Sequence, residues 1–261
     1  MTQTPTDGIE PRPLADQRVL ILGGTSGIGL ETARAFRAEG ACVVVSGRSH
    51  ARGAEASGLL GGAPFLPCDG AEPTAVQTMV DEAERALGRI DTLVISTGGT
   101  RLPELLFRQT LEDIQTALAQ DLAPFLYTAR AALPGMMREG RGCILSIASD
   151  AGKVATPGEA IIGAGMAAII QFTRTLAMEA KRNGIRANVL TPSLVEGTPL
   201  TDRLMVEGSF SAKLFTKARP LAALGPTEAQ DLAALAVFLA SPAARRITGQ
   251  AISVNGGISA A

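Results

Sequence analysis

The sequence is poor in aromatic side chains and in histidine. Among its 261 residues there is no tryptophan, one tyrosine (Tyr127) and one histidine (His50), and aromatic residues make up 3% of the chain. A metal site built on several histidines is therefore excluded, and Tyr127 is the only tyrosine that could act as an acid or a base.

Cysteine and clustered charge are also scarce. The three cysteines Cys42, Cys68 and Cys143 lie far apart in apolar or strand-like surroundings, which predicts small buried side chains in a reducing compartment and neither a disulfide nor a metal site. The formal net charge is −1 and neither sign forms long blocks, so we expect no nucleic-acid partner and no polybasic membrane contact.

No run of about 18 apolar residues is evident, which argues against a membrane span. The first residues, MTQTPTDGIEPRP, are polar and rich in proline, unlike a signal peptide. We therefore predict a cytoplasmic protein with a flexible N-terminal arm over residues 1–13.

Short apolar runs alternate with longer amphipathic ones along the rest of the chain. The apolar runs lack a two-residue alternation, which is typical of strands buried on both faces. They cover residues 19–24, 42–47, 63–68, 92–97, 143–148, 187–192 and 251–256. Helices are predicted at about residues 27–39, 73–87, 110–138, 162–182 and 228–240.

This alternation predicts an α/β fold. We expect a Rossmann-like, doubly wound parallel sheet of about seven strands with helices on both faces, forming a single domain over residues 14–261. The alternation of predicted strands and helices is interrupted at residues 194–220. Such a segment near the carboxyl ends of strands is expected to form a flap over a ligand or a contact in an oligomer.

The first predicted strand runs into a glycine-rich turn, GGTSGIG, at residues 23–29. Gly23, Gly27 and Gly29 stand where a side chain would collide with a pyrophosphate held at a helix N-terminus. This context predicts dinucleotide binding. The next predicted strand ends in Gly47-Arg48, where an acid would bind the ribose of NAD, so Arg48 is either a 2′-phosphate contact or a surface arginine.

The spacing GxxxGxG and the motifs that follow it resemble those of the short-chain dehydrogenase/reductase family. The resemblance runs from about Leu14 to Ser259 and includes Cys68-Asp69, LVISTGG (93–99), CILSIAS (143–149), IRANVLTPS (185–193) and ITGQAISVNGG (247–257). It implies a nucleotide site formed by Gly23, Thr25, Ser26, Gly27, Ile28, Gly29, Arg48, Asp69 and Gly98.

The family transfers hydride with a tyrosine acid, a lysine four residues later, a serine thirteen residues before the tyrosine, and an asparagine in the preceding long helix. The resemblance places these roles at Ile162, Met166, Ser149 and Asp121 of this chain. Only the serine is present, within a segment IIGAGMA (161–167) that has no proton-transfer group. We therefore expect no catalytic set, with Ser149 as a remnant.

Substitutes for the missing acid are few. Asp150, Lys153 and Glu159 lie in the loop after Ser149 and could approach the site, although a loop lysine is more often solvated. NAD(P) is possible but weakened or absent. Met166 cannot bond a ribose, Ile95 and Ser96 stand at two family asparagines, and Ser193 stands at a family glycine. Losing one charged hydrogen bond predicts roughly tenfold weaker binding.

The leading hypothesis is a degenerate short-chain dehydrogenase homologue that serves as a non-catalytic, structural or regulatory subunit. Its partner would be itself or an active paralogue, in an NAD-dependent and possibly acyl-CoA-oxidising dehydrogenase complex. The helices at 110–138 and 162–182 resemble the faces through which the family pairs its subunits, and close helix approach is allowed by the small residues Gly163, Ala164, Gly165, Ala167 and Ala168. Two alternatives remain open: a non-redox isomerase, cyclase or lyase that uses Ser149, and a dinucleotide-responsive regulator.

Overall fold

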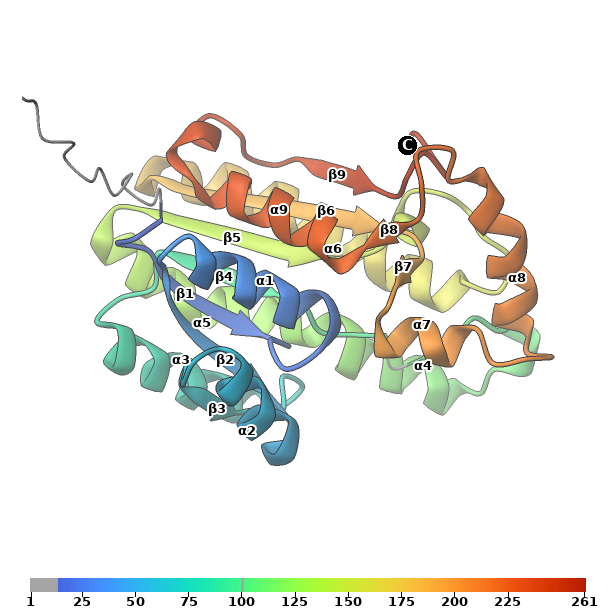
Figure 1. Cartoon of the computed structure of the whole chain (residues 1–261), viewed down its shortest axis with the longest axis horizontal. Helices are drawn as coiled ribbons and strands as arrows, with labels where there is room; N and C mark the ends of the chain where they lie inside the picture. Colours follow the sequence, from blue (N-terminus) through green and yellow to red (C-terminus); the bar gives the residue numbers. More distant parts are fainter. Residues whose placement is uncertain (1–13, 100) are drawn as a thin grey trace, which may run out of the picture.

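The computed structural model describes residues 14–99 and 101–261, so the arm predicted over residues 1–13 lies outside the described residues. A seven-stranded parallel sheet with the order β3-β2-β1-β4-β5-β6-β9 runs through the molecule (Figure 1). The predicted α/β class, the single domain and the seven strands are confirmed.

The strands of this sheet are β1 (Arg18–Leu22), β2 (Cys42–Gly47), β3 (Phe65–Pro67), β4 (Thr92–Ile95), β5 (Gly142–Ile147), β6 (Ile185–Pro192) and β9 (Ala251–Val254). The main helices are α1 (Gly27–Ala38), α2 (His50–Leu59), α3 (Pro73–Leu87), α4 (Leu111–Ala117), α5 (Ala123–Glu139), α6 (Ala160–Ala180) and α9 (Ala229–Ala240).

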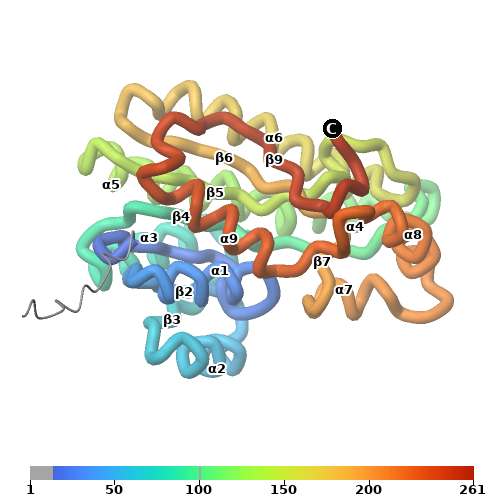
Figure 2. Tube along the Cα trace, turned by 45° about the horizontal axis from the view of Figure 1, so that its top comes forward, coloured from blue at the N-terminus to red at the C-terminus, as the bar shows by residue number. Residues whose placement is uncertain are grey.

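Two apolar cores lie on opposite faces of the sheet. Successive side chains of a strand point to opposite faces, so Leu20 and Leu22 of β1 join one core while Val19 and Ile21 join the other. Helices α3, α5 and α6 cover the first core, and α1 and α9 cover the second (Figures 1 and 2). Because all seven strands run parallel, their carboxyl ends lie at one edge of the sheet.

Several predicted boundaries need correction. The helix predicted over residues 110–138 is α4 and α5 joined by a π-helical turn at Leu118–Leu122, and α6 begins at Ala160 instead of residue 162. Helix α2 was not predicted, because its mixed alanine, glycine and charged residues carry little apolar periodicity.

The segment at 194–220 contains three short elements. These are β7 (Val195–Glu196), which pairs with β8 (Thr227–Glu228), and the helices α7 (Pro199–Leu204) and α8 (Phe210–Ala218). Leu194, Leu204 and Phe215 form a small buried cluster of their own. The segment therefore packs as a separate unit beside the strand ends, and the flap function stays a prediction.

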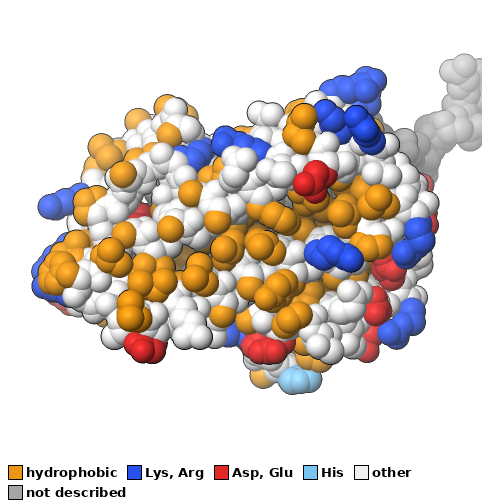
Figure 3. All heavy atoms as spheres, turned by 180° about the vertical axis from the view of Figure 1, so that it is seen from behind, with side chains coloured by type: hydrophobic (Ala, Val, Ile, Leu, Met, Phe, Trp, Pro, Cys, Tyr) orange, Lys and Arg blue, Asp and Glu red, His pale blue; other side chains and the backbone are white. Residues whose placement is uncertain are grey.

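Helix α6 has a buried face and an outer face that is apolar in its first half, whereas its second half exposes Gln171, Arg174 and Glu179. By length and composition alone, Ala160–Asn183 is apolar enough to cross a membrane, with a mean hydropathy of 1.4, and 33% of its most apolar window is buried. Its buried face packs on β6 through residues such as Ile169 and Ile170. Seen from the side of α3, α5 and α6, hydrophobic side chains gather over the surface (Figure 3).

Candidate functional site

The turn between β1 and α1 depends on glycine. Gly23 has a φ of +83°, and a Cβ there would lie 2.2 Å from the backbone oxygen of Ser96. A Cβ on Gly29 would lie 2.1 Å from the backbone oxygen of Gly23. Only glycine lets β1, β4 and α1 approach so closely. The turn therefore brings the start of α1 against the carboxyl end of the sheet.

The N-terminus of α1 is suited to an anion. No side chain caps it, since Ser26 at the N-cap position makes no side-chain hydrogen bond to the helix, and the first turn has no acidic residue. Free N–H groups and the helix dipole favour a phosphate there. The structure thus offers the feature that a pyrophosphate requires.

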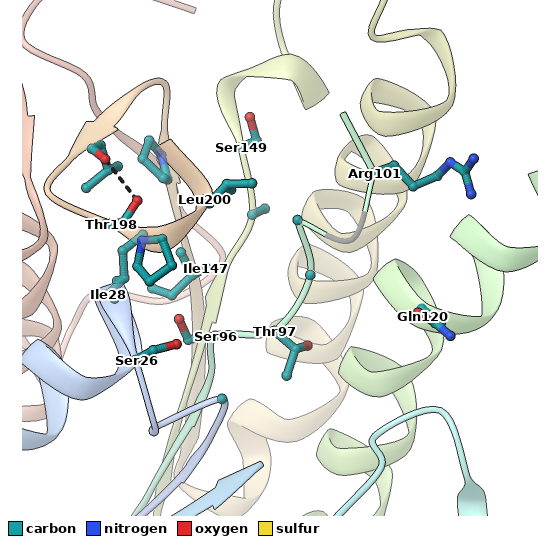
Figure 4. Close-up of a pocket in the computed structure, with 18 of the residues that line it drawn as sticks. Ser26, Ile28, Ser96, Thr97, Arg101, Gln120, Ile147, Ser149, Thr198 and Leu200 are labelled. Carbon is teal, nitrogen blue, oxygen red and sulfur yellow. Dashed lines mark hydrogen bonds between the residues drawn. The ribbon is translucent and has the colours of Figure 1, made fainter. Parts of the chain in front are cut away.

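A cavity of about 560 Å³ opens beside this turn and extends along the strand ends. Figure 4 shows Ser26 and Ile28 on its α1 side and Ser149 on its β5 side. Eight of the nine predicted nucleotide residues line it, namely Gly23, Thr25, Ser26, Gly27, Ile28, Arg48, Asp69 and Gly98. Gly29 is absent from the lining and serves the packing of α1 on the turn.

The other end of the cavity holds the residues that stand at the family's reaction positions. Ser149 lies two residues beyond the end of β5, and its Oγ accepts a hydrogen bond of 3.2 Å from the N–H of Ala151. Ile162 and Met166 lie one helical turn apart on α6 and both line the cavity. Neither side chain can donate or accept a proton, so the structure brings the serine and two inert side chains together.

Asp121 does not line the cavity, although its neighbour Gln120 does. It lies in the π-helical turn between α4 and α5 and is 8% exposed. A Cβ on Gly98 would lie 3.7 Å from its Oδ1, so the carboxyl group borders the Gly98 segment. Such π turns often occur at functional sites, and this one directs Asp121 toward the loop after β4.

The three loop residues considered as substitutes separate into two groups. Glu159 lines the cavity, whereas Asp150 and Lys153 do not. The interpretation of Lys153 as a solvated side chain is wrong: it is 10% exposed, donates to Ser253 Oγ and pairs with Asp150 Oδ1 at 3.7 Å.

Asp150 is the centre of a buried polar cluster. Its carboxylate also accepts from Asn255 Nδ2, from Ser259 Oγ at 2.8 Å and from Ser253 Oγ at 3.2 Å. Paired in this way, Asp150 and Lys153 hold the loop after Ser149 against the C-terminal residues and are not available to a ligand.

The single tyrosine and the single histidine of the sequence do not contribute to the cavity. Tyr127 on α5 is 37% exposed, His50 stacks edge-on against Phe65 at a ring distance of 6.1 Å, and neither lines the cavity.

Sequence reasoning missed several lining side chains. Thr97, Arg52, Arg101 and Arg203 line the cavity and were not predicted, and Ser96 and Ser193, which were placed only by resemblance, line it together with Ser149. These arginines come from α2, from the segment after β4 and from α7, which no local pattern connects in the sequence. Arg203 donates to the backbone oxygen of Gly99 at 2.9 Å, which ties α7 to the cavity wall.

The cysteines and metal-binding groups add no chemistry. Burial raises the pKa of Cys68, which lines the cavity, to about 11, so its thiol stays protonated at neutral pH. Cys42 is exposed at the start of β2, against the prediction that all three cysteines are buried. In residues 14–99 and 101–261, no cluster of three or more His, Cys, Asp or Glu side chains could hold a metal ion.

Comparison with known proteins places this geometry among oxidoreductases. A family model described as enoyl-(acyl carrier protein) reductase matches residues 23–259. The 3-oxoacyl-[acyl-carrier-protein] reductase of Chlamydia pneumoniae is 32% identical over 249 residues, covering 94% of this chain and 98% of that protein. The (3R)-3-hydroxyacyl-CoA dehydrogenase of Mus musculus is 31% identical over 253 residues, covering 92% and 95%.

A solved structure supports the same relationship. The 3-ketoacyl-(acyl-carrier-protein) reductase from Brucella melitensis, complexed with NADH, superposes with a TM-score of 0.85 at 28% identity. The match covers 94% of this chain and 98% of that one.

Proposed function

Because the chain belongs to the short-chain dehydrogenase/reductase family, we propose that it is a catalytically degenerate member of it, serving as a non-catalytic subunit of an NAD-dependent dehydrogenase complex. The observation that carries the proposal is the pair Ile162 and Met166, which line the cavity beside Ser149. The subunit role includes structural support and regulation of the partner.

The physical argument concerns the proton. Reduction of a carbonyl needs a proton at the oxygen as hydride arrives at the carbon, and a positioned acid typically contributes 10²- to 10⁴-fold to the rate. The α6 residues that line the cavity with Ser149 are Ile162 and Met166, which supply no base, acid or cation. We therefore propose that this chain alone does not reduce carbonyls at a useful rate.

Binding of NAD(P) is part of the proposal, at reduced affinity. The uncapped α1 N-terminus and the glycine turn fit a pyrophosphate, and Asp69 lies at the adenine end of the cavity. The nicotinamide end offers less, because a thioether at Met166 cannot hydrogen-bond a ribose. When bound, the cofactor would supply hydride chemistry that this chain's own residues do not assist.

The proposed partner is an active paralogue or a second copy of this chain, in the cytoplasm. Support comes from the outer face of α5 and α6, where Tyr127, Met137 and Met178 are 37%, 44% and 62% exposed. A Cβ added at Gly165 would meet no atom within 4 Å, which leaves room for a neighbouring helix. Gly163, in contrast, is needed inside the fold, because a Cβ there would lie 2.7 Å from the oxygen of Ala151.

An acyl-CoA-oxidising complex is the most specific form of this proposal. Its model case is the inactive subunit of a two-subunit enzyme such as 2-[hydroxy(phenyl)methyl]succinyl-CoA dehydrogenase. The similarity to reductases and dehydrogenases of acyl thioesters supports that substrate class.

Native mass spectrometry of the untagged protein from its own cells tests the proposal. We expect a mixed assembly with a short-chain dehydrogenase that has both the tyrosine and the lysine. A pure homo-oligomer that turns over no substrate with NAD(P) would rule out the active paralogue and leave a second copy of this chain as the partner. A pure homo-oligomer with dehydrogenase activity would refute the proposal.

A second candidate function is a non-redox enzyme, such as an isomerase, cyclase or lyase. One observation favours it: the carboxyl group of Glu159 lines the same cavity as the hydroxyl of Ser149. If this candidate is right, the chain converts a substrate without NAD(P), and Ser149→Ala abolishes that turnover.

A further inference from the structure

The reaction end of the cavity has a titratable side chain that the family mechanism does not use. Glu159 stands directly before α6, and its side chain lines the cavity that Ser149 and Ile162 also line. The backbone around it is held on both sides, since its N–H donates to Thr156 O at 3.0 Å and its carbonyl accepts from Gly163 N at 2.6 Å. These two hydrogen bonds fix the backbone from which the Glu159 side chain projects.

The surroundings of the Glu159 carboxyl group disfavour its ionised form. Burial raises the pKa of Glu159, and a hydrogen bond from the Thr156 side chain opposes the shift only in part. Within the described residues, Glu159 forms no ion pair. The other charged groups lining the cavity are Asp69, Arg48, Arg52, Arg101 and Arg203. A partly buried acid without a cationic partner is more typical of a ligand site than of a structural contact.

The hydrogen-bonding capacity of this end selects a type of ligand. A ketone oxygen only accepts hydrogen bonds, so a ketone needs donors around it, and Ser149 can supply one. In its ionised form the carboxyl group of Glu159 only accepts hydrogen bonds and would repel the lone pairs of a ketone oxygen, so the discrimination against a ketone applies at a pH where Glu159 is ionised. A hydroxyl group can donate to Glu159 and accept from Ser149 at the same time.

We propose that this cavity binds the hydroxyl form of an acyl thioester, held between Ser149 and Glu159, in preference to the corresponding ketone. The alkyl part of the ligand lies against apolar lining residues such as Ile162, Met166 and Leu204. The inference rests on the proposed function, because a ligand that is bound and not oxidised acts as a signal or a structural element of the subunit.

A matched pair of ligands tests this preference. The protein purified from its own cells, in whatever assembly it forms, is titrated calorimetrically with 3-hydroxybutyryl-CoA and with acetoacetyl-CoA, without NAD(P). At pH 7.5 we expect the hydroxy compound to bind at least tenfold more tightly. Equal affinity, tighter binding of the ketone, or no binding of either compound would overturn the inference.

Variants assign the preference to the carboxyl group. Glu159→Gln keeps the size of the side chain but lets it donate to a ketone oxygen, so we expect the tenfold preference to disappear. Glu179→Gln is the control, since Glu179 is exposed near the other end of α6. A preference that survives Glu159→Gln, or that is lost in both variants, would contradict the assignment.

Stability gives an independent readout with a defined sign. A raised pKa means that folded Glu159 holds its proton more tightly than the unfolded chain does, so its contribution to stability falls as pH rises above the ordinary value of 4.5. Glu159→Gln should therefore raise the Tm at pH 7.5, and the increase should shrink toward pH 4.5. A lower Tm for Glu159→Gln at pH 7.5 would indicate a structural role.

The two proposals fail separately. Mass spectrometry of the assembly does not depend on Glu159, and the change in ligand preference between the wild type and Glu159→Gln reports on this chain's cavity whatever the partner binds. A chain that reduces acetoacetyl-CoA by itself would refute the proposed function, whereas a chain that is inert but prefers acetoacetyl-CoA would refute only the ligand preference.

Discussion

The two ends of the cavity are built from different parts of the chain. The nucleotide end is shaped by backbone, where Gly23 and Gly29 allow β1, β4 and α1 to approach, and a side chain there would meet backbone atoms at 2.2 and 2.1 Å. The reaction end is shaped by side chains that project from α6, whose backbone stays helical whether residue 162 is tyrosine or isoleucine. Reaction chemistry can therefore change in such a protein while the fold and the nucleotide end stay intact.

The largest expected effect would come from restoring the reaction end. In the double variant Ile162→Tyr with Met166→Lys, both new side chains project from α6 into the cavity beside Ser149. We expect acetoacetyl-CoA reduction with NADH or NADPH to rise by about 10²- to 10⁴-fold above the wild type.

Met166→Lys alone is the matched control, because it adds the cation without the proton donor. If the wild type were as active as the double variant, the reaction end of the cavity would not lack a proton donor, and the contrast between the two ends would be wrong. A folded double variant that binds NAD(P) but shows no gain would mean that the reaction end differs from the family in more than these two residues.

A single methyl group added at Gly23, at the nucleotide end of the cavity, should destabilise the fold. Gly23→Ala places a Cβ at a φ of +83°, against the oxygen of Ser96. Strain and overpacking together predict a loss of about 2–4 kcal/mol in the free energy of unfolding. Urea denaturation followed by circular dichroism measures it.

Gly165→Ala is the control for the glycine substitution. Gly165 lies inside α6 with no atom within 4 Å of an added Cβ, so alanine should stabilise the isolated chain by about 0.5–1 kcal/mol. Equal losses in the two variants would show that the turn has no special steric requirement.

An effect smaller than that of Gly23→Ala is expected on the choice of nucleotide. Arg48 and Arg52 are exposed and line the adenine end of the cavity, where a 2′-phosphate would lie. Arg48→Ala should weaken NADP binding by roughly tenfold or more and change NAD binding little. Calorimetry with both nucleotides measures the two affinities. An equal loss of affinity for NAD and NADP would mean that Arg48 does not recognise the 2′-phosphate.

The sequence predicted the sheet well because buried parallel strands appear as short apolar runs, and all seven runs are strands. Helix α2 was missed because its alanines and glycines carry little periodicity. The π-helical turn at Leu118–Leu122 was also missed, since its hydrogen bonding differs from that of an α-helix without a distinct residue pattern. Asp121 could therefore be aligned with the family but not placed in space.

The site was predictable where a residue follows a predicted strand or occupies a position in the family's spacing. Ser149, Ile162 and Met166 could be brought together through the family spacing, and eight nucleotide residues through the turn and the strand ends. Arg203 reaches the cavity from α7, and Lys153 is buried by Ser253, a hundred positions later. Such contacts depend on the tertiary packing of distant segments, which no local pattern reports.

The buried cluster around Asp150 has a consequence for biosynthesis. The loop after Ser149 is held by Asn255 and Ser259, which follow Asp150 by 105 and 109 positions. At about 5–20 residues per second, a ribosome needs roughly 5–20 seconds to add them. During that interval the strands up to β6 can already pair, while the carboxylate of Asp150 still faces water. The loop after Ser149 is therefore fixed in place only late in synthesis. A nascent chain halted before Asn255 should not hold a ligand beside Ser149.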